Sequence, residues 1–385
     1  MVALPPAARQ DALVAAQAGL MQRYSHEIDI LRMQHEEDFL ATNCAEANNL
    51  HGDLPLYLRI RAADAQREFD AYDQYVRDST LHNHMCTRIK SQLRSPFAAR
   101  PTLHDRFELL ELLGASSSGI ELWKATDLLT GTLVTLKVSS DERMLTYDHK
   151  ALARCDSHQY LVRLCSDMGV MRCVYAGHPY ALYATEFVEE DLQTHLFRRP
   201  GGRLIEVQAQ TIAFKVAQFI QFLQNDSKVA HCDIRPANIL LNTISLDIRV
   251  TNLKSSRSRR ERAPTIPHHL VKVMDSAQLL YAPPESFFCL ERYGNMVECG
   301  AADVWALGVL YFFMLYGHHP LEPGLVLLTD DLKLAFVEQL RQFDQVEFPA
   351  TPPVSPAIQA TIRACLQKNP SERMASNILV TRGFF

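Results

Sequence analysis

The spacing of apolar and polar residues along the chain predicts a run of helices followed by strands and then more helices. Over residues 11–90, apolar side chains recur at intervals of three and four, as in Leu20, Tyr24 and Ile28, which is typical of amphipathic helices. A Gly-Asp-Leu-Pro turn at residues 52–55 favours two long helices over one. Their apolar stripes require burial, either by coiled-coil self-association or against the following domain.

After a proline-containing linker, the pattern changes to that of a sheet and then back to that of helices. Alternating apolar positions predict strands at residues 107–113, 121–125, 133–138 and 180–187. Helical spacing returns at residues 143–155, 207–224, 302–315 and 357–366. This order predicts an α+β architecture with a small β-rich lobe and a large helical lobe, preceded by long helices.

The stretch of residues 231–241 carries the clearest chemical signal. It places Asp233 two residues after His231, and Asn238 five residues beyond Asp233, between apolar flanks. This is the spacing of the catalytic loop of protein kinases. In that mechanism a carboxylate accepts the proton of the substrate hydroxyl and an amide oxygen helps to hold magnesium. Asp233 and Asn238 are therefore the candidates for these roles, and a buried turn with a polar loop is the alternative.

A second candidate site lies in the predicted sheet. Gly114, Ser116 and Gly119 belong to a Gly- and Ser-rich hairpin tip, which can lay backbone N–H groups over phosphates. The strand at residues 133–138 then carries one inward-facing lysine, Lys137, at the distance expected for a lysine that binds nucleotide phosphates. An ordinary turn and a solvent-exposed lysine are the alternatives when each feature is taken alone.

Composition and charge limit the classes of function. The 385 residues are 47% hydrophobic and 22% charged, and the net charge of −5 argues against a surface built as a whole for nucleic acid. Nine cysteines are scattered singly, which favours a reducing intracellular compartment over a disulfide framework or a zinc module. No apolar run approaches the roughly 18 residues of a membrane span, so no membrane partner is expected. These features predict a nuclear or cytoplasmic protein.

The candidate motifs follow one order that predicts a two-lobed protein kinase fold. A Gly-rich hairpin, a strand lysine and the catalytic-loop pattern are followed by Pro-Pro-Glu at residues 283–285, an Asp-x-Trp-x-x-Gly helix from Asp303, and Arg373. The predicted boundaries are a helical, possibly coiled-coil region at 1–95, a linker at 96–106 and a kinase domain at 107–385. Within that domain, the N-lobe spans about 107–188 and the C-lobe about 189–385.

Several stretches are more specific and resemble Tousled-like serine/threonine kinases. They are Pro101-Thr-Leu-His-Asp-Arg-Phe107, His231-Cys-Asp-Ile-Arg-Pro-Ala-Asn238, Val271-Lys-Val-Met-Asp275 before Tyr281-Ala-Pro-Pro-Glu285, Met314-Leu-Tyr-Gly-His-His-Pro320 and Val346-Glu-Phe-Pro349. The resemblance is close from residue 101 to about residue 373. Helical, partly coiled-coil N-terminal regions are also typical of that family.

The resemblance implies ATP-dependent phosphorylation of serine or threonine in protein substrates, with chromatin-assembly factors such as histone chaperones as the family's substrates. It also implies assembly through N-terminal coiled coils and a nuclear location. The cofactors would be ATP and Mg²⁺. Glu186 and Val188, at the end of the last N-lobe strand, would contact the nucleotide together with the glycine loop.

Three departures from the kinase pattern fall on nucleotide and metal handling. Asn252-Leu253-Lys254 stands where an active kinase has Asp-Phe-Gly. The expected metal ligands, Asn238 and Asn252, are therefore both neutral, whereas Mg²⁺ favours anionic oxygen, and we expect weakened metal binding. The glycine loop has Ser116 in place of a glycine. No glutamate stands at the usual place to pair with Lys137, and Glu142 and Asp148 are the candidate substitutes.

Two functional hypotheses follow. The first is a divergent kinase with Asp233 as base, Lys137 on the phosphates, and Asn238 with Asn252 on the metal. The second is a pseudokinase that acts as a binding or scaffold protein. The basic run at residues 254–262 is predicted to be a mobile, solvated loop, with an acidic chaperone or nucleic acid as the alternative partner.

Overall fold

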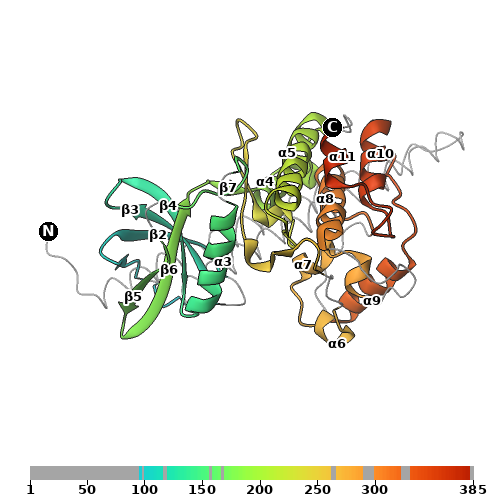
Figure 1. Cartoon of the computed structure of the whole chain (residues 1–385). Coiled ribbons are helices and arrows are strands. Elements are labelled where there is room, and N and C mark those ends of the chain that lie inside the picture. The colour runs from blue at the N-terminus through green and yellow to red at the C-terminus, as the bar shows by residue number, and fades with distance from the viewer. Residues whose placement is uncertain are drawn as a thin grey trace, which may run out of the picture.

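The computed structural model of the chain describes residues 95–97, 99–115, 119–155, 158–165, 169–261, 266–288, 299–321 and 330–381. The predicted N-terminal helices, and the self-association that would depend on them, lie outside these residues. The described part forms two lobes: a sheet with one helix, and a larger, mostly helical lobe (Figure 1).

The N-lobe contains a six-stranded antiparallel sheet with the strand order β1-β2-β3-β4-β6-β5. Its strands are β1 (Thr102–Leu103), β2 (Phe107–Ala115), β3 (Glu121–Asp127), β4 (Thr132–Ser139), β5 (Met171–Tyr175) and β6 (His178–Glu186). Helix α3 (Glu142–Arg154) packs against β6 and β4, and Asp141 begins this helix by accepting hydrogen bonds from Arg143 N and Met144 N. The sheet and α3 therefore enclose the strand that carries Lys137.

The stretch predicted as a linker is partly built into the N-lobe. Phe97 is buried, with its ring 4.8 Å from that of Tyr180 and 6.5 Å, edge-on, from that of Trp123. Leu103 is buried in β1 and pairs with Phe107 of β2. Burying a large apolar side chain is worth about 1.5–3 kcal/mol, so Phe97 and Leu103 hold this stretch against the sheet edge.

The C-lobe is organised around α8 (Cys299–Tyr316), which packs on α5 (Glu206–Asn225) and α10 (Pro356–Cys365). Helix α8 is long and apolar enough to cross a membrane by length and composition, but 83% of it is buried inside the protein. It is the central helix of the hydrophobic core. The remaining helices are α4 (Leu192–Phe197), α6 (His268–Val271), α7 (Ser276–Tyr281), α9 (Asp330–Gln342) and α11 (Ser376–Thr381), with short 3-10 turns η1 (Pro200–Gly202), η2 (Pro236–Asn238), η3 (Leu253–Ser255) and η4 (Pro284–Ser286).

We expect Gly308→Ala to destabilise the C-lobe, because Gly308 lies where α8 meets α10. An added Cβ would approach Cys365 Cβ to 2.7 Å and Leu366 Cγ to 2.9 Å. Overpacking of this kind typically costs about 1–3 kcal/mol. Chemical denaturation should show this loss, whereas Gly169→Ala, with nothing within 4 Å of the added Cβ, should be close to neutral. Equal stability of the two variants would contradict the close packing of α8 on α10.

Two small sheets position the segments around the catalytic loop. Strands β7 (Glu190–Asp191), β9 (Ile239–Leu241) and β10 (Ile248–Val250) form one, and β8 (Val229–Ala230) pairs with β11 (Arg257–Ser258) in the other. The basic run expected to be a mobile loop is therefore ordered as η3 and β11 through Glu261. Its backbone hydrogen bonds to β8 hold it beside the approach to the catalytic loop.

Candidate active site

The lysine of β4 has a buried anionic partner. Lys137 Nζ donates a hydrogen bond to Asp148 Oδ2 of α3 at 2.7 Å, and Tyr183 Oη of β6 donates to the same oxygen at 2.7 Å. All three side chains are buried. Burial raises the pKa of Asp148, but the charge of Lys137 and the two hydrogen bonds outweigh it, so the net shift of the pKa is downward. The carboxylate form of Asp148 is thus the one that holds Lys137.

Asp148 is the substitute for the missing glutamate, and Glu142 is not. Glu142 lies at the exposed start of α3 and forms an ion pair with Arg172 of β5 at 2.6 Å. Asp148 shares the inward face of α3 with Leu145 and Leu152, which are both fully buried. This face, at i, i+3 and i+7, is the sequence signal that distinguishes the two candidates, because it places Asp148 toward the sheet.

Asp303 of α8 holds the backbone of the catalytic loop in place. Its carboxylate accepts hydrogen bonds from the backbone N–H groups of His231 and Cys232 at 2.7 and 2.8 Å. Cys232 has a positive φ of 62°, an uncommon conformation for a non-glycine residue. Burial raises the pKa of Asp303 to about 7, although both backbone hydrogen bonds act in the opposite direction. The Asp303 contacts stabilise the turn that presents Asp233.

His231 is a structural member of the loop. Burial lowers the pKa of its imidazole, so the neutral form is favoured. The backbone N–H of Asp233 donates to Nδ1 at 3.2 Å, so the ring proton is on Nε2, which lies 3.1 Å from the carbonyl oxygen of Thr251. The imidazole therefore connects the catalytic loop to the segment that precedes Asn252.

Asp233, Asn238 and Asn252 are brought together as the motifs predicted. Asn238 Nδ2 donates to the backbone carbonyl of Asp233 at 2.7 Å. Asn252, in the left-handed region with φ of 70°, donates from Nδ2 to Asp233 Oδ2 at 3.0 Å and to Asn238 Oδ1 at 3.1 Å. One side-chain amide thus joins the oxygens of the other two residues.

This donor set suits a magnesium ion poorly. The amide nitrogen of Asn252 is directed at Asp233 Oδ2 and at Asn238 Oδ1, the oxygen that the expected ligand Asn238 would offer to a cation. Asp233 supplies the single negative charge among the three residues, whereas Mg²⁺ favours several hard oxygen ligands in near-octahedral geometry. A cation at this point would require the Asn252 amide to turn so that its oxygen, and not its nitrogen, is directed at the site.

The charge of Asp233 is shared with a residue that the sequence reasoning missed. Arg235 Nε lies 3.1 Å from Asp233 Oδ1, and Arg235 Nη1 lies 3.0 Å from Asp275 Oδ2. Asp275 in turn accepts a hydrogen bond from Ala277 N at the start of α7. The sequence does place an arginine two residues after Asp233, which is the signal that could have indicated this contact. Arg235 places a permanent positive charge beside the carboxylate that would receive a proton.

The candidate nucleotide-binding residues are distributed over the N-lobe and the connection to the C-lobe. Gly114 lies in β2, and Gly119 precedes β3 with φ of 78°, a conformation that favours glycine. Ser116 lies outside the described residues. The Glu186 carboxylate is engaged with the protein, since it accepts from Arg163 N and Arg249 Nε, each at 2.9 Å. A nucleotide contact at Glu186 would therefore come from its main chain, and half-buried Val188 follows it.

An ion pair between two of the sequence motifs secures the C-lobe. Arg373 Nη2 donates to Glu285 Oε2 at 2.6 Å, and each side chain is 1% exposed. The Arg373 guanidinium also lies 5.0 Å from the ring centroid of Trp305, a cation–π arrangement. These contacts tie η4 to the end of the chain and to α8.

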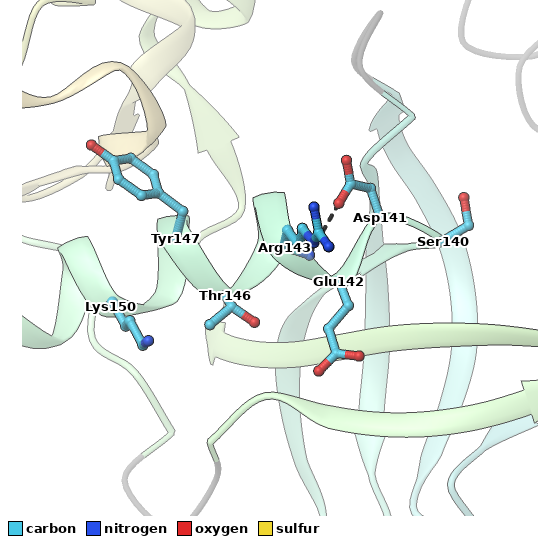
Figure 2. Close-up of a pocket in the computed structure, with 7 residues that line it drawn as sticks. All are labelled: Ser140, Asp141, Glu142, Arg143, Thr146, Tyr147 and Lys150. Atoms are coloured by element: carbon cyan, nitrogen blue, oxygen red, sulfur yellow. Dashed lines mark hydrogen bonds between the residues drawn. The ribbon is translucent and has the colours of Figure 1, made fainter.

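An open hollow of about 850 Å³ lies on the outer side of α3, away from the catalytic residues. It is lined by Ser140, Asp141, Glu142, Arg143, Thr146, Tyr147 and Lys150. In Figure 2, Tyr147 extends from α3 toward a neighbouring segment, and Glu142 points to the opposite side of the helix. This hollow contains none of the residues expected to bind the nucleotide.

Comparisons with known proteins agree with this geometry. Residues 107–385 match the family described as protein kinase domain. The chain is 26% identical over 330 residues to serine/threonine-protein kinase TOUSLED of Arabidopsis thaliana, covering 81% of this chain and 46% of that protein. It is 26% identical over 334 residues to serine/threonine-protein kinase tousled-like 2 of Homo sapiens, covering 83% of this chain and 41% of the relative. The chain thus spans less than half the length of these relatives.

Proposed function

This chain belongs to the protein kinase family, and from that premise we propose that it is a divergent serine/threonine kinase that transfers a phosphoryl group from ATP to protein substrates. The two-lobed fold and the resemblance to Tousled-like kinases, both predicted from sequence motifs, are confirmed. ATP and Mg²⁺ are used by protein kinases in general. What is proposed for this chain is its own catalytic activity.

The observation that carries the nucleotide-binding part of the proposal is the buried Lys137–Asp148 pair. A lysine and an aspartate with 5% and 1% exposed side chains are costly to bury unless they are paired. Replacing such a pair by apolar residues is often neutral or stabilising, so its presence is not required by the fold alone. A carboxylate that holds Lys137 in place inside the N-lobe supports a role for this lysine on nucleotide phosphates.

The other residues have roles that follow from their contacts. Asp233 would accept the proton of a substrate hydroxyl, and Asn238 keeps the Asp233 backbone in place through its hydrogen bond to the Asp233 carbonyl. Arg235 would offer positive charge close to the transferred phosphoryl group while orienting the Asp233 carboxylate. Since the magnesium ligands fit poorly, we assign no step to a metal and propose that metal binding is weak.

The experiment that tests the proposal is a radiolabel transfer assay with the purified full chain, ATP and a mixture of generic protein substrates, with and without Mg²⁺ or Mn²⁺. We expect phosphoserine or phosphothreonine to form at a low rate. Absence of transfer under every metal condition would overturn the catalytic proposal. Histone chaperones, which the family resemblance suggests, are the first specific substrates to try, and a nuclear location is part of the same proposal.

A second candidate function is favoured by the Asn252 amide. Because this group satisfies Asp233 and Asn238 without any cation, the same fold could serve as a pseudokinase that binds partner proteins and carries out no transfer. Binding of ATP with no transfer would favour this alternative. It would also be consistent with the buried Lys137–Asp148 pair, because that pair concerns nucleotide phosphates and not the acceptor hydroxyl.

We expect Asn252→Asp to increase the Mg²⁺-dependent affinity for ATP by about tenfold, because a second carboxylate replaces a neutral amide at the metal position. The measurement is a thermal-shift titration with ATP, with and without Mg²⁺. Asn242→Asp, at an exposed turn between β9 and β10, is the matched control and should leave the affinity unchanged. An Asn252→Asp variant without added metal dependence would argue against weak ligands as the cause of poor metal binding.

A further inference from the structure

A second concave site lies behind α3, on the side that faces the basic run. It is a cavity of about 590 Å³ formed by the C-terminal half of α3, the turn before β8, and the η3–β11 segment. Its charged lining residues are Lys150, Arg154, Lys228, Lys254, Arg257 and Glu261. Five cationic residues and one acidic residue thus line the cavity, in a chain whose net charge is −5.

Part of this positive charge has no ion-pair partner within the described part of the chain. Arg257 pairs with Glu261 at 2.9 Å, and Lys228 Nζ donates to the backbone carbonyl of Asn225. Among the described residues, no carboxylate forms an ion pair with Lys150 or Arg154, whereas the charge of Lys254 acts on the Asp148 carboxylate. The cavity therefore concentrates positive charge from three separate segments that its own acidic residue does not balance.

The walls of the cavity are held together by a side-chain hydrogen bond and by strand pairing. Tyr147 Oη of α3 donates a hydrogen bond to the carbonyl of Ser256 at 3.0 Å, and β11 pairs with β8 through Arg257 and Ala230. Ser255 and Ser258 add hydroxyl groups to the lining. Cationic side chains and hydroxyl groups on segments that are held in place form a suitable site for an oxyanion. Charge-assisted hydrogen bonds to phosphate are among the strongest hydrogen bonds in proteins.

We propose that this cavity binds a phosphomonoester group carried by a phosphoserine or phosphothreonine of a partner protein. A phosphate group with nearly two negative charges and three acceptor oxygens matches the excess of cations. Nucleic acid would need an extended track of cations with aromatic platforms for bases. Here the cations meet in one cavity, and the hydroxyl of its lining aromatic side chain, Tyr147, is bound to Ser256. The cavity contains neither Lys137 nor Asp233, and it is coupled to the Lys137–Asp148 pair only through the charge of Lys254.

The test is fluorescence anisotropy of the full chain, without nucleotide, with degenerate peptides that carry a central phosphoserine or phosphothreonine. We expect the phosphorylated peptides to bind at least tenfold more tightly than the same peptides without phosphate. The double variant Lys150→Glu, Arg154→Glu should weaken that binding at least tenfold. Both positions are exposed on a helix and glutamate is a good helix former, and circular dichroism would check that the variant is folded.

The control is Arg143→Glu, Lys272→Glu, which makes the same change in net charge at exposed positions outside the cavity and should bind phosphopeptide as the wild type does. Equal binding of phosphorylated and unphosphorylated peptides, or equal loss in both double variants, would overturn the proposal. Tighter binding of a single-stranded oligonucleotide that is lost in the cavity variant would replace it with a nucleic-acid site. Competition by millimolar inorganic phosphate, with no preference for phosphopeptide, would reduce it to a small-anion site.

Discussion

Asp233→Asn is expected to reduce phosphoryl transfer by about 10²–10⁴-fold, the usual contribution of a positioned general base. The variant amide has nearly the same shape as the carboxylate but cannot accept the hydroxyl proton. The contact with Asn252 Nδ2 survives if the variant oxygen occupies the place of Oδ2. Initial rates of radiolabel transfer, together with an unchanged thermal shift by ATP, would show that chemistry is lost and nucleotide binding is kept.

The control for this experiment is Asp247→Asn. Asp247 is an exposed aspartate that pairs with Lys215 on the surface of the C-lobe, and its replacement should leave the transfer rate unchanged. If Asp233→Asn retained the wild-type rate, the observed transfer would come from another base or from a contaminating kinase. The assignment of Asp233 as the base would then be wrong, and the pseudokinase alternative would follow if the transfer were traced to a contaminating kinase.

The second large effect is expected for Asp148→Asn, which leaves Lys137 buried without a charged partner. Removing one member of a buried ion pair typically costs about 3–5 kcal/mol of folding free energy. Tyr183, whose hydroxyl donates to Asp148, would also lose its charged acceptor. We expect a lower free energy of unfolding in denaturant titration and a weaker thermal shift by ATP, because Lys137 is no longer held in place.

Glu142→Gln provides the comparison within the same helix. Glu142 forms its ion pair with Arg172 in solvent, where ion pairs contribute little, so no measurable change is expected. Asp148→Glu would restore the charge with one additional methylene and should recover part of the stability. If Asp148→Asn were as stable as Glu142→Gln, Lys137 would have to find another anion, and the assignment of Asp148 would be wrong.

The order of the motifs was sufficient to predict the fold, because Lys137, Asp233, Asp303 and Arg373 each need a particular tertiary neighbour and occur in the order that supplies it. The partner of Lys137 stayed ambiguous, because kinase spacing pointed to positions occupied by other residue types. Helical periodicity contained the answer, since Asp148 shares a buried face with Leu145. The local helical pattern therefore identifies Asp148, whereas the kinase spacing does not.

Other features depend on contacts that no local pattern encodes. The hydrogen bonds of Asn252 require the left-handed backbone at this residue and the approach of a loop from another part of the sequence. The order of the basic run comes from pairing with β8, almost thirty residues earlier, so its polar composition alone suggested a mobile loop. Phe97 is similar, because a single aromatic residue in a short proline-containing stretch does not reveal the ring cluster that buries it.

The short carboxylate of Asp148 has a consequence for inhibitor discovery. An aspartate reaches one methylene less far than a glutamate, so α3 has to remain close to β4 for the 2.7 Å contact with Lys137 to persist. Compounds that bind only when α3 is displaced from the sheet would have to separate Lys137 from Asp148. The free energy of separating this buried pair, about 3–5 kcal/mol, would oppose their binding. Screening should therefore favour chemotypes that bind with α3 against the sheet, and Tyr183 beside the pair offers such compounds a point of selectivity.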